Sequence, residues 1–322
     1  MKGQAVAIAH PNVALSKYWG KREGEGNVPA VPSLSVTLDG LSTRTQVRWH
    51  SELPGHRVLL GGRELPRAEA QRMNALLDRV QVAAGLSEFA EVESSSDFPV
   101  ASGLASSASG FAALALAAVR AAELDWDASR VSDLARRASA SAARSIYAGF
   151  VELDGAIARP VAPPEYLPLV VLVCVTTEAP KTIGSTEGMR LTMERSPYAR
   201  AWLEEAPRLH ELLREALLAR DFDRVGQLAE ASALAMHASA MAAGVMYFSG
   251  ATLGALDAVR ALRGAGMRVY ATMDAGPHVK VLALPADAEH VRSTLARVPG
   301  VLRVIDSRPG QGASVVNGRR AP

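Results

Sequence analysis

Residues 97–114 read DFPVASGLASSASGFAAL, in which small and hydroxyl-bearing residues stand between a predicted strand over 89–93 and a predicted Ala-rich helix over 110–124. Small side chains let the backbone approach an anion closely, hydroxyl groups donate hydrogen bonds, and the start of the following helix presents free N–H groups and the positive end of its dipole. The stretch therefore predicts a phosphate-binding loop. It is not a P-loop of the GxxxxGK[ST] type, because no Lys follows the second Gly. On composition alone, a flexible Ser/Gly turn that caps a helix explains the stretch equally well.

The first half of the chain around this loop alternates between short strands and helices. We predict strands over 5–9, 33–38, 43–49 and 57–60, and helices over 67–84 and from 127 or 129 to about 138. Asp39-Gly40 and Gly61-Gly62 are turn signals, and Gly85 stands where the first helix would stop. The later helix runs into the unusual string ASASAARS at 138–145.

The second half begins with a nearly continuous apolar run over 167–175, which is typical of a strand covered on both faces. Residues 196–242 have a helical pattern that is broken at 221–223. The remaining predicted elements are a helix over 253–262, strands over 267–273 and 279–284, a helix over 287–298 and a strand over 301–306. This order favours an α+β sandwich with helices on one face of a sheet. We place a domain boundary near residue 180, which gives units 1–180 and 181–322.

Composition narrows the class of protein. The chain has 322 residues, 48% of them hydrophobic and 21% charged, which predicts a globular protein of about two domains. The formal net charge of +2 gives no support to nucleic-acid or membrane binding through bulk charge. One cysteine, Cys174, can form no disulfide within the chain and no zinc cluster, which fits a reducing compartment. Because no signal peptide or apolar run of membrane-spanning length is visible, we expect a soluble, cytoplasmic protein.

Residues 12–22, NVALSKYWGKR, form a second candidate site. Lys17 and Lys21 are four positions apart and flank Tyr18 and Trp19, so a helix or tight turn would present two cations and a phenol to one anion. Taken alone, the segment is better explained as a solvated basic face with its Trp packed inward.

Three other segments carry polar residues that suggest chemistry. Arg144 stands among serines at 139–145, as bidentate binding of a phosphate or carboxylate requires, although an exposed Arg at a helix end is commoner. Residues 184–189, GSTEGM, form a hydroxyl-rich turn ahead of a helix. Asp274 lies in a Gly-Pro turn between two strands, where an Asp usually bonds its own backbone. His237 and Cys174 are expected to be packing residues of the core.

Together, six segments in order resemble the diphosphomevalonate decarboxylase family of the GHMP kinase superfamily. The segments are NVALSKYWGKRE, NVPAVPSLSVTL, DFPVASGLASSASGFAAL, ASASAARSIYAGFVEL, STEGMRLT and MDAGPH. The resemblance runs from residue 5 to about 285. It implies an α+β, GHMP kinase-like two-domain fold, with an N-terminal part like ribosomal protein S5 domain 2 and a ferredoxin-like C-terminal part. It also implies a homodimer.

The activity that the resemblance implies belongs to the mevalonate route of isoprenoid biosynthesis. It is the ATP-dependent decarboxylation of mevalonate 5-diphosphate to isopentenyl diphosphate, ADP, phosphate and CO₂, with Mg²⁺ as cofactor. Relatives that act on the 5-monophosphate, or that only phosphorylate the 3-hydroxyl of mevalonate, are the enzymatic alternatives. A GHMP-fold regulatory protein that binds the ligand without turnover is the non-enzymatic one.

Residue roles follow from the same resemblance. Asp274, Lys17 and Arg144 are the implied catalytic residues, with Asp274 beside the 3-hydroxyl and Lys17 near the transferred phosphoryl group. The implied substrate-binding residues are Tyr18, Trp19, Gly20, Lys21, Arg72, Ser139, Ala140, Ser141, Ala142, Ala143, Arg144 and Thr186. The implied ATP-binding residues are Ser102, Gly103, Leu104, Ala105, Ser106, Ser107, Ala108 and Ser109, with Ser106 and Ser107 as metal ligands.

Five positions depart from the family pattern. They are Val31, Ala138, Ala140, Ala143 and His278. An Ala in place of Gly narrows the allowed backbone and adds a methyl group beside the substrate loop. We therefore expect these changes to bear on which substrate is accepted more than on the type of reaction.

Overall fold

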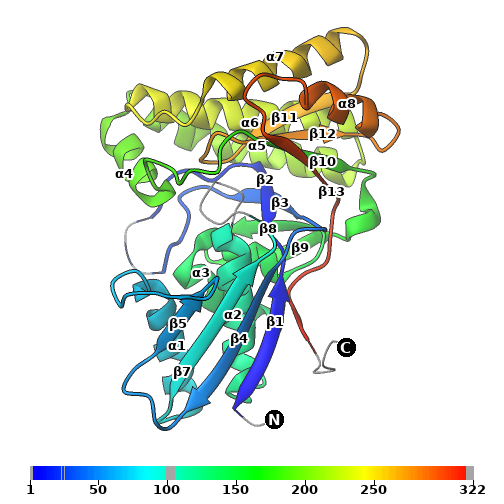
Figure 1. Ribbon diagram of the computed structural model, residues 1–322. Coiled ribbons are helices and arrows are strands. Elements are labelled where there is room, and N and C mark those ends of the chain that lie inside the picture. The colour runs from blue at the N-terminus through cyan, green and yellow to red at the C-terminus, as the bar shows by residue number, and fades with distance from the viewer. Residues whose placement is uncertain (1–2, 23, 25, 99–105, 317–322) are drawn as a thin grey trace.

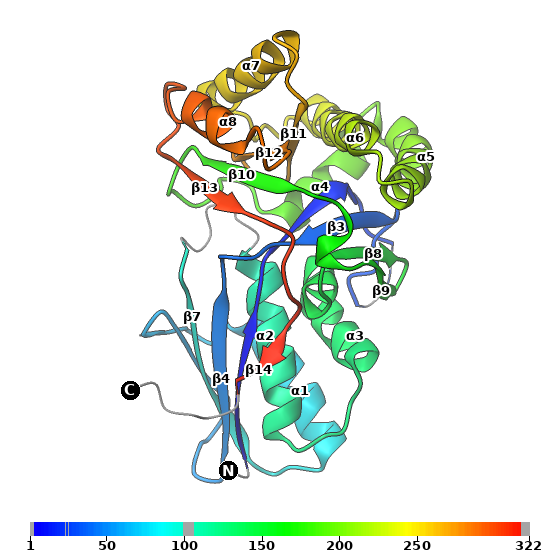
Figure 2. The ribbon, with the colours of Figure 1, turned by 90° about the vertical axis from the view of Figure 1, so that its right-hand side faces the viewer.

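The computed structural model describes residues 3–22, 24, 26–98 and 106–316. In Figure 1 the chain forms a lower unit with long strands and an upper unit dominated by helices. The described strands form three sheets, of which the six-stranded one, in the order β14-β1-β4-β7-β5-β6, occupies the lower unit. Its strands are β1 (Gln4–Ala9), β4 (Thr43–His50), β5 (Arg57–Leu60), β6 (Arg63–Glu64), β7 (Phe89–Ser96) and β14 (Ser314–Val315). Figure 2 shows β14, from the end of the chain, lying beside β1.

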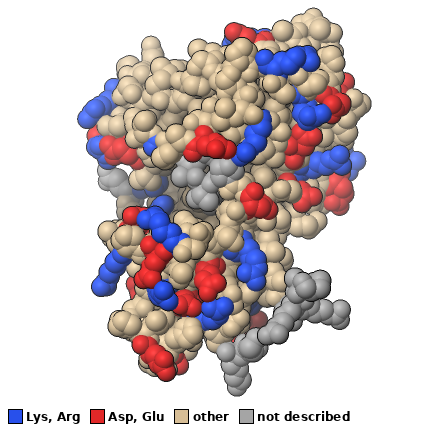
Figure 3. Space-filling model, in the orientation of Figure 1, with Lys and Arg blue, Asp and Glu red and all other residues tan. Residues whose placement is uncertain are grey.

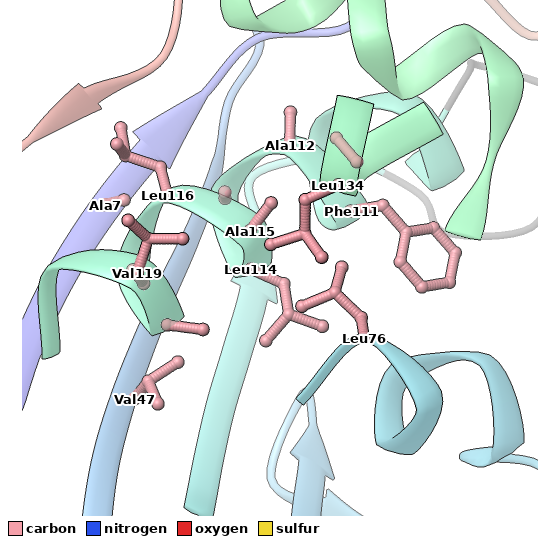
Figure 4. Packing of buried hydrophobic residues seen from close by; sticks show 14 of the residues in the cluster. Ala7, Val47, Leu76, Phe111, Ala112, Leu114, Ala115, Leu116, Val119 and Leu134 are labelled. Atoms are coloured by element: carbon pink, nitrogen blue, oxygen red, sulfur yellow. The ribbon is translucent and has the colours of Figure 1, made fainter. Parts of the chain in front are cut away.

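Helix α2 (Ser106–Ala121) packs on this sheet, and α1 (Gln71–Ala84) and α3 (Ala128–Ala138) pack against α2 in the same hydrophobic core. Figure 4 shows why α2 is rich in alanine: it lies between Ala7 and Val47 of the strands and Leu76 and Leu134 of the other helices. Small side chains let a helix with neighbours on several sides approach all of them closely. The start of α2 is thereby held at the upper end of the sheet.

A second sheet, in the order β2-β3-β8-β9, lies at the junction of the two units. Its strands are β2 (Asn12–Ser16), β3 (Ser33–Thr37), β8 (Phe150–Asp154) and β9 (Ile157–Ala162), and the 3₁₀ helices η1 (Ala140–Ile146) and η2 (Pro164–Tyr166) border it. The sequence pattern predicts β3 but not β2. Residues 12–16, which fall in the segment interpreted as a possible helix or tight turn, form a strand. Asp39-Gly40 does not join a hairpin, because β3 and β4 belong to different sheets.

The third sheet, in the order β11-β12-β10-β13, forms the centre of the upper unit. Its strands are β10 (Val170–Val175), β11 (Val269–Met273), β12 (Val279–Ala283) and β13 (Arg303–Ser307). The accompanying helices are α4 (Ser185–Arg195), α5 (Ala199–Leu218), α6 (Phe222–Ala242), α7 (Gly250–Gly264) and α8 (Ala288–Leu295).

Alternate residues of β10 point to two different cores. Leu172 and Cys174 pack with α7 and α8, whereas Val171 and Val173 pack with α5, α6 and strands β2 and β3. The prediction that this strand is covered on both faces is confirmed. The prediction that the helices lie on one face of the sheet holds only for α7 and α8. Helix α5 packs in the other core, and α6 contributes Val225 and Ala229 to that core and Ala233 to the core with α7 and α8.

The predicted end of the first helix and the predicted starts of two others are confirmed. Gly85 ends α1 with φ 64°, the Asp127 side chain caps α3, and Asp221 caps α6 where the helical pattern is interrupted. The division at residue 180 stays a prediction, although the pairing of β10 with β12 and β13 favours placing this strand with the upper unit. No helix within the described ranges has the length and hydrophobicity needed to cross a membrane.

The contact between α6 and β11 generates a prediction about stability. A Cβ added at Gly226 would overlap the ring of Tyr270, whereas one added at Gly264 would meet nothing within 4 Å. We expect Gly226→Ala to lower the free energy of unfolding by about 1–3 kcal/mol through overpacking. Gly264→Ala, also in a helix, should leave it unchanged or raise it by up to about 1 kcal/mol. The measurement is urea unfolding followed by far-UV circular dichroism, and equal effects of the two changes would contradict the described packing.

Candidate active site

A cavity of about 880 Å³ lies between the two units and is lined by residues from both. Its polar lining residues are Asn12, Lys17, Tyr18, Lys21, Asn27, Thr43, Thr45, Glu69, Arg72, Ser94, Ser96, Ser107, Ser139, Ser141, Arg144, Lys181, Ser185, Thr186, Glu187 and Asp274. Figure 3 shows Lys and Arg mixed with Asp and Glu over the outer face that it displays. A gathering of cations around one space is therefore a feature of the cavity and not of that surface.

Asp274 stands at one wall of the cavity between two lysines. Lys17 Nζ lies 2.7 Å from Asp274 Oδ1, and Lys280 Nζ lies 3.1 Å from Asp274 Oδ2. Both lysine side chains are 2% exposed, whereas the carboxylate, which lines the cavity, is 24% exposed. The arrangement leaves a carboxylate held from both oxygens and still open to the cavity.

The charges of this cluster set its protonation. Burial alone would raise the pKa of the Asp274 carboxyl, but the charges of Lys17 and Lys280 together outweigh it and hold that pKa well below its usual range. For Lys17, burial outweighs the attraction of Asp274 and lowers the pKa to about 8, with Lys280 and Arg144 adding to the decrease. Asp274 is therefore an anion throughout the physiological range, while Lys17 loses its proton as the pH rises through about 8.

Local structure explains where Lys17 points. The pairing of β2 with β3 shifts register between Ala14 and Ser16, and Lys17 follows this irregularity. The Ser16 hydroxyl accepts a hydrogen bond from the Leu34 N–H, a main-chain group of the neighbouring strand. Lys17 then donates through its backbone N–H to Ser232 on α6 and through its ammonium group to the Ala14 carbonyl. Backbone and side chain of Lys17 are thus both fixed, the former across the two units.

Behind this turn, a buried chain of hydrogen bonds links three elements. The Ser16 hydroxyl lies 3.0 Å from His210 Nδ1 on α5, and His210 Nε2 lies 3.0 Å from Glu152 on β8. These two hydrogen bonds further limit movement of the end of β2, next to Lys17.

Arg144 is buried beside the same wall. Its Nε donates to Ser35 Oγ at 2.9 Å, and its two terminal nitrogens donate to Ser33 Oγ at 2.7 Å and to Asn12 Oδ1 at 3.2 Å. The guanidinium group has five N–H donors, so these contacts leave two for a ligand. The hydroxyls that hold Arg144 come from β3 and not from the neighbouring serines at 139–145 that suggested this site.

A second group of cations lies at another part of the lining. Lys21 Nζ donates to Asn27 Oδ1 at 2.7 Å and to Thr186 Oγ1 at 3.1 Å, and Arg72 donates to the Ala138 carbonyl. Burial and the charge of Arg72 lower the pKa of Lys21, which indicates that the two cations are close enough to repel each other. Such a pair is suited to an anion with more than one negative charge.

The start of α2, which follows the predicted phosphate loop in the sequence, lies at the cavity. Ser102, Gly103, Leu104 and Ala105 lie outside the described residues, and of Ser106 only its place at the start of α2 is described. Ser107 is exposed and lines the cavity, but Ala108 and Ser109 are buried in the core, where the Ser109 hydroxyl bonds Thr43.

Several other predicted residues are structural neighbours of the site. Tyr18, Trp19, Ala140 and Thr186 line the cavity, whereas Gly20, Ala142 and Ala143 are not among its lining residues. Ala142 and Ala143 are fully buried on η1, where they hold the helix that carries Arg144. The structure gives both residues a packing role, and their contact with substrate stays a prediction.

The departures from the family pattern divide in the same way. Ala138 and Ala140 line the cavity near the second cation group, while Val31 and Ala143 are buried in packing clusters. His278 is buried, and its Nδ1 accepts a hydrogen bond from the Thr176 N–H at the end of β10.

Sequence reasoning missed four polar side chains that the fold brings to Asp274 and Arg144: Asn12, Ser33, Ser35 and Lys280. The lysine carried a signal, because a single charge in the apolar strand Val279–Ala283 needs a buried partner. Asn12, Ser33 and Ser35 carried no comparable signal. His237 is a core residue as predicted, with its ring against Tyr247 and Phe248. Burial raises the pKa of Cys174 to about 12, as expected for an inert packing thiol.

The comparison with known proteins identifies the family. Residues 9–157 match the diphosphomevalonate decarboxylase-like N-terminal domain, and residues 171–311 match the mevalonate 5-diphosphate decarboxylase C-terminal domain. The human diphosphomevalonate decarboxylase is 36% identical over 87% of this chain and 77% of its own length. The chain belongs to the diphosphomevalonate decarboxylase family. Its members are enzymes, so the non-enzymatic alternative is not supported.

Two further relatives of this decarboxylase family bear on substrate and fold. The phosphomevalonate decarboxylase of Haloferax volcanii is 32% identical over 91% of this chain and 92% of its own. A solved structure of MDDEF in complex with MVAPP, AMPPCP and magnesium superposes with a TM-score of 0.90, at 34% identity, over 98% of this chain and 99% of that one. The expected α+β, GHMP kinase-like two-domain fold is thereby confirmed.

The bonds of Arg144 lead to a prediction for this decarboxylase-family chain. Arg144→Lys keeps the charge but replaces a planar fork by a point cation that cannot reach Ser33, Ser35 and Asn12 together. We expect the free energy of unfolding to fall by about 1–3 kcal/mol, because buried polar groups lose partners, and kcat/KM to fall with it.

The control is Arg200→Lys, at a side chain that is 91% exposed and pairs with Glu204. It should change neither quantity, because exposed ion pairs contribute little. Normal kinetics for Arg144→Lys would place Arg144 outside the active site.

Proposed function

We propose that this protein catalyses the ATP-dependent decarboxylation of mevalonate 5-diphosphate to isopentenyl diphosphate, ADP, phosphate and CO₂. The observation that carries the proposal is the Asp274 carboxylate between Lys17 and Lys280, at the wall of a cavity that also contains Lys21 and Arg72. A substrate with a tertiary hydroxyl, a carboxylate and a charged phosphate tail requires one acceptor for the hydroxyl and cations for the rest. The chain supplies both in the lining of one cavity.

Asp274 orients the 3-hydroxyl in this proposal. The Asp274 carboxylate, an anion at the working pH, holds the hydroxyl in line for phosphoryl transfer and accepts its proton as the γ-phosphoryl group arrives. Lys17, beside it, offsets negative charge on the transferred phosphoryl group. The phosphorylated hydroxyl then leaves C3 as phosphate, and the electron pair of the breaking bond to the carboxyl carbon forms the alkene as CO₂ departs.

The tail of the substrate is assigned to the second cation group. Lys21 and Arg72 supply charge, and the hydroxyls of Ser139, Ser141 and Thr186 supply donors around them. Arg144, with two N–H groups left, is assigned to the substrate carboxylate or the nearer phosphate.

The start of α2 is assigned to ATP. Ser107 offers a hydroxyl oxygen, a type of ligand that Mg²⁺ accepts, and no cluster of His, Cys, Asp and Glu that could hold a metal exists in the described part of the chain. The chain thus fits a magnesium ion bound mainly through substrate phosphates, with Ser106 and Ser107 as the proposed protein ligands. When bound, this ion neutralises charge on the transferred phosphoryl group.

The 5-monophosphate is the second candidate substrate. The relative from Haloferax volcanii is named phosphomevalonate decarboxylase, and it is similar over most of its length. The departures Ala138 and Ala140 lie at the proposed tail site, where the two substrates differ.

The test is a comparison of substrates by CO₂ release and ADP formation in the presence of Mg²⁺. We expect both products from mevalonate 5-diphosphate, and neither from mevalonate at matched concentration. CO₂ from the monophosphate with none from the diphosphate would move the assignment to the second candidate. ADP with a 3-phosphorylated product and no CO₂ would identify a kinase and refute the decarboxylase.

Asp274→Asn tests the role of the carboxylate. We expect kcat to fall by about 10²–10⁴-fold, the range attached to assistance by one acid–base group. Substrate affinity should change little, since Lys21 and Arg72 remain. Asp257→Asn, at an exposed ion pair with Arg260, is the matched control and should leave kcat unchanged. A large loss of affinity with nearly normal kcat would contradict the assignment.

The homodimer implied by the resemblance and the cytoplasmic location expected from the composition remain proposals. Sedimentation of the purified protein measures the first, and fractionation of cells measures the second.

A further inference from the structure

We propose that Lys280 is a positioning residue for the decarboxylation, which acts by holding Asp274 and by adjusting the charge of Lys17. The inference rests on the proposed function and extends it to a residue outside the motifs that suggested that function. It starts from the ion pair between Lys280 Nζ and Asp274 Oδ2.

The strand register places Lys280 at the junction of the two units. Lys280 on β12 is opposite Thr272 on β11, and the Thr272 hydroxyl lies 3.5 Å from the carbonyl oxygen of Ala14 on β2. Lys280 therefore shares the sheet face that looks toward β2 and the neighbouring Lys17. Its neighbours Val279 and Val281 point to the other face, into the core with α7 and α8.

Burial of Lys280 makes its charge consequential. The residue is 1% exposed and sits in an otherwise apolar strand, where a charge is costly unless it is paired. Asp274 supplies that pairing, but it also pairs with Lys17, so one carboxylate serves two buried cations. Asp274 is consequently fixed through both oxygens, and a rotation of its carboxylate would break one of two ion pairs.

The cluster carries more positive than negative charge. The groups that face it are Lys17 and Tyr18 after β2, Arg144 on η1, Lys181 between β10 and α4, His237 on α6 and Asp274 after β11. Burial lowers the pKa of His237 to about 3, so that ring is neutral at working pH. Asp274 is thus the acidic group that offsets the surrounding ammonium and guanidinium groups.

The charge of Lys280 affects the protonation of two neighbouring groups. Its charge favours the anionic form of Asp274, and it disfavours the ammonium form of Lys17. Removal of the charge should therefore allow Lys17 to keep its proton to a higher pH. The alkaline limb of kcat/KM, which reports the free enzyme, is expected above about pH 8 in the unaltered protein and at higher pH without Lys280.

The experiment compares Lys280→Met with the unaltered protein in the CO₂ assay from pH 6 to pH 10. Methionine has a similar length without the charge. We expect kcat to fall by about 10- to 100-fold, as for partners that orient a reacting group, with KM changed much less. We also expect the alkaline limb to move upward by at least about half a pH unit.

The matched control is Thr272→Val, a change without charge at the opposite residue of the neighbouring strand. A change that only disturbs packing lowers the maximum of kcat/KM but leaves the pH of the alkaline limb unchanged. We expect this behaviour of Thr272→Val. Lys280→Arg keeps a cation and should leave the limb unmoved while restoring part of kcat. Lys280→Gln gives a second neutral variant if the Met protein does not fold.

Each outcome has a distinct meaning. An active unaltered protein together with an unmoved or lowered limb in the neutral variants would overturn the inference alone. An unaltered protein that releases no CO₂ from either phosphorylated substrate would refute the proposed function and the inference with it. A lower kcat with a raised limb in the neutral variants, and with an unmoved limb in Thr272→Val, supports it.

Discussion

The ion pair between Lys17 and Asp274 joins residues 257 positions apart, and the rest of the site depends on that meeting. It requires the end of β2 to lie against the end of β11. One hydrophobic cluster provides the contact. It contains Leu15 of β2 and Val36 of β3 from the junction, and Val173 of β10 and Leu213 of α5 from the upper unit. Because packed interiors resist small displacements, the two ends are held by a continuous core. The buried hydrogen bonds of Ser16 and Lys17 fix the backbone at the end of β2 and the side chain of Lys17.

The same core explains how the chain tolerates charges that would otherwise be expensive. Arg144 is satisfied by Ser33, Ser35 and Asn12, and Lys17 by a carbonyl oxygen as well as by Asp274. Hydrogen bonds to neutral oxygens reduce the cost of burial but do not cancel the charge. The excess of positive charge is therefore available to an anionic ligand. The buried positive charge lowers the stability of the free protein, and binding of a phosphorylated substrate offsets that loss.

Sequence reasoning succeeded where the information was local. The stop at Gly85, the cap at Asp127 and the break at Asp221 depend on a few adjacent residues, and the apolar run of β10 shows its burial directly. Strand partners depend on contacts between distant segments, which is why β3 and β4 could not be assigned to different sheets. The family resemblance assigned Lys17 and Asp274 to one site. It said nothing of Lys280, which the pairing of β11 with β12 places opposite Thr272.

Two groups of cations divide the work of the cavity. In the proposed function, the group around Asp274 acts at the hydroxyl-bearing carbon, and the other group, Lys21 with Arg72, binds the tail of the substrate. The lining departures Ala138 and Ala140 fall beside the second group, and Asp274 and Lys17 retain the family residues. In the same proposal, the choice between mono- and diphosphate is made at the second group. This division agrees with the similarity of this chain both to a phosphomevalonate decarboxylase and to diphosphomevalonate decarboxylases.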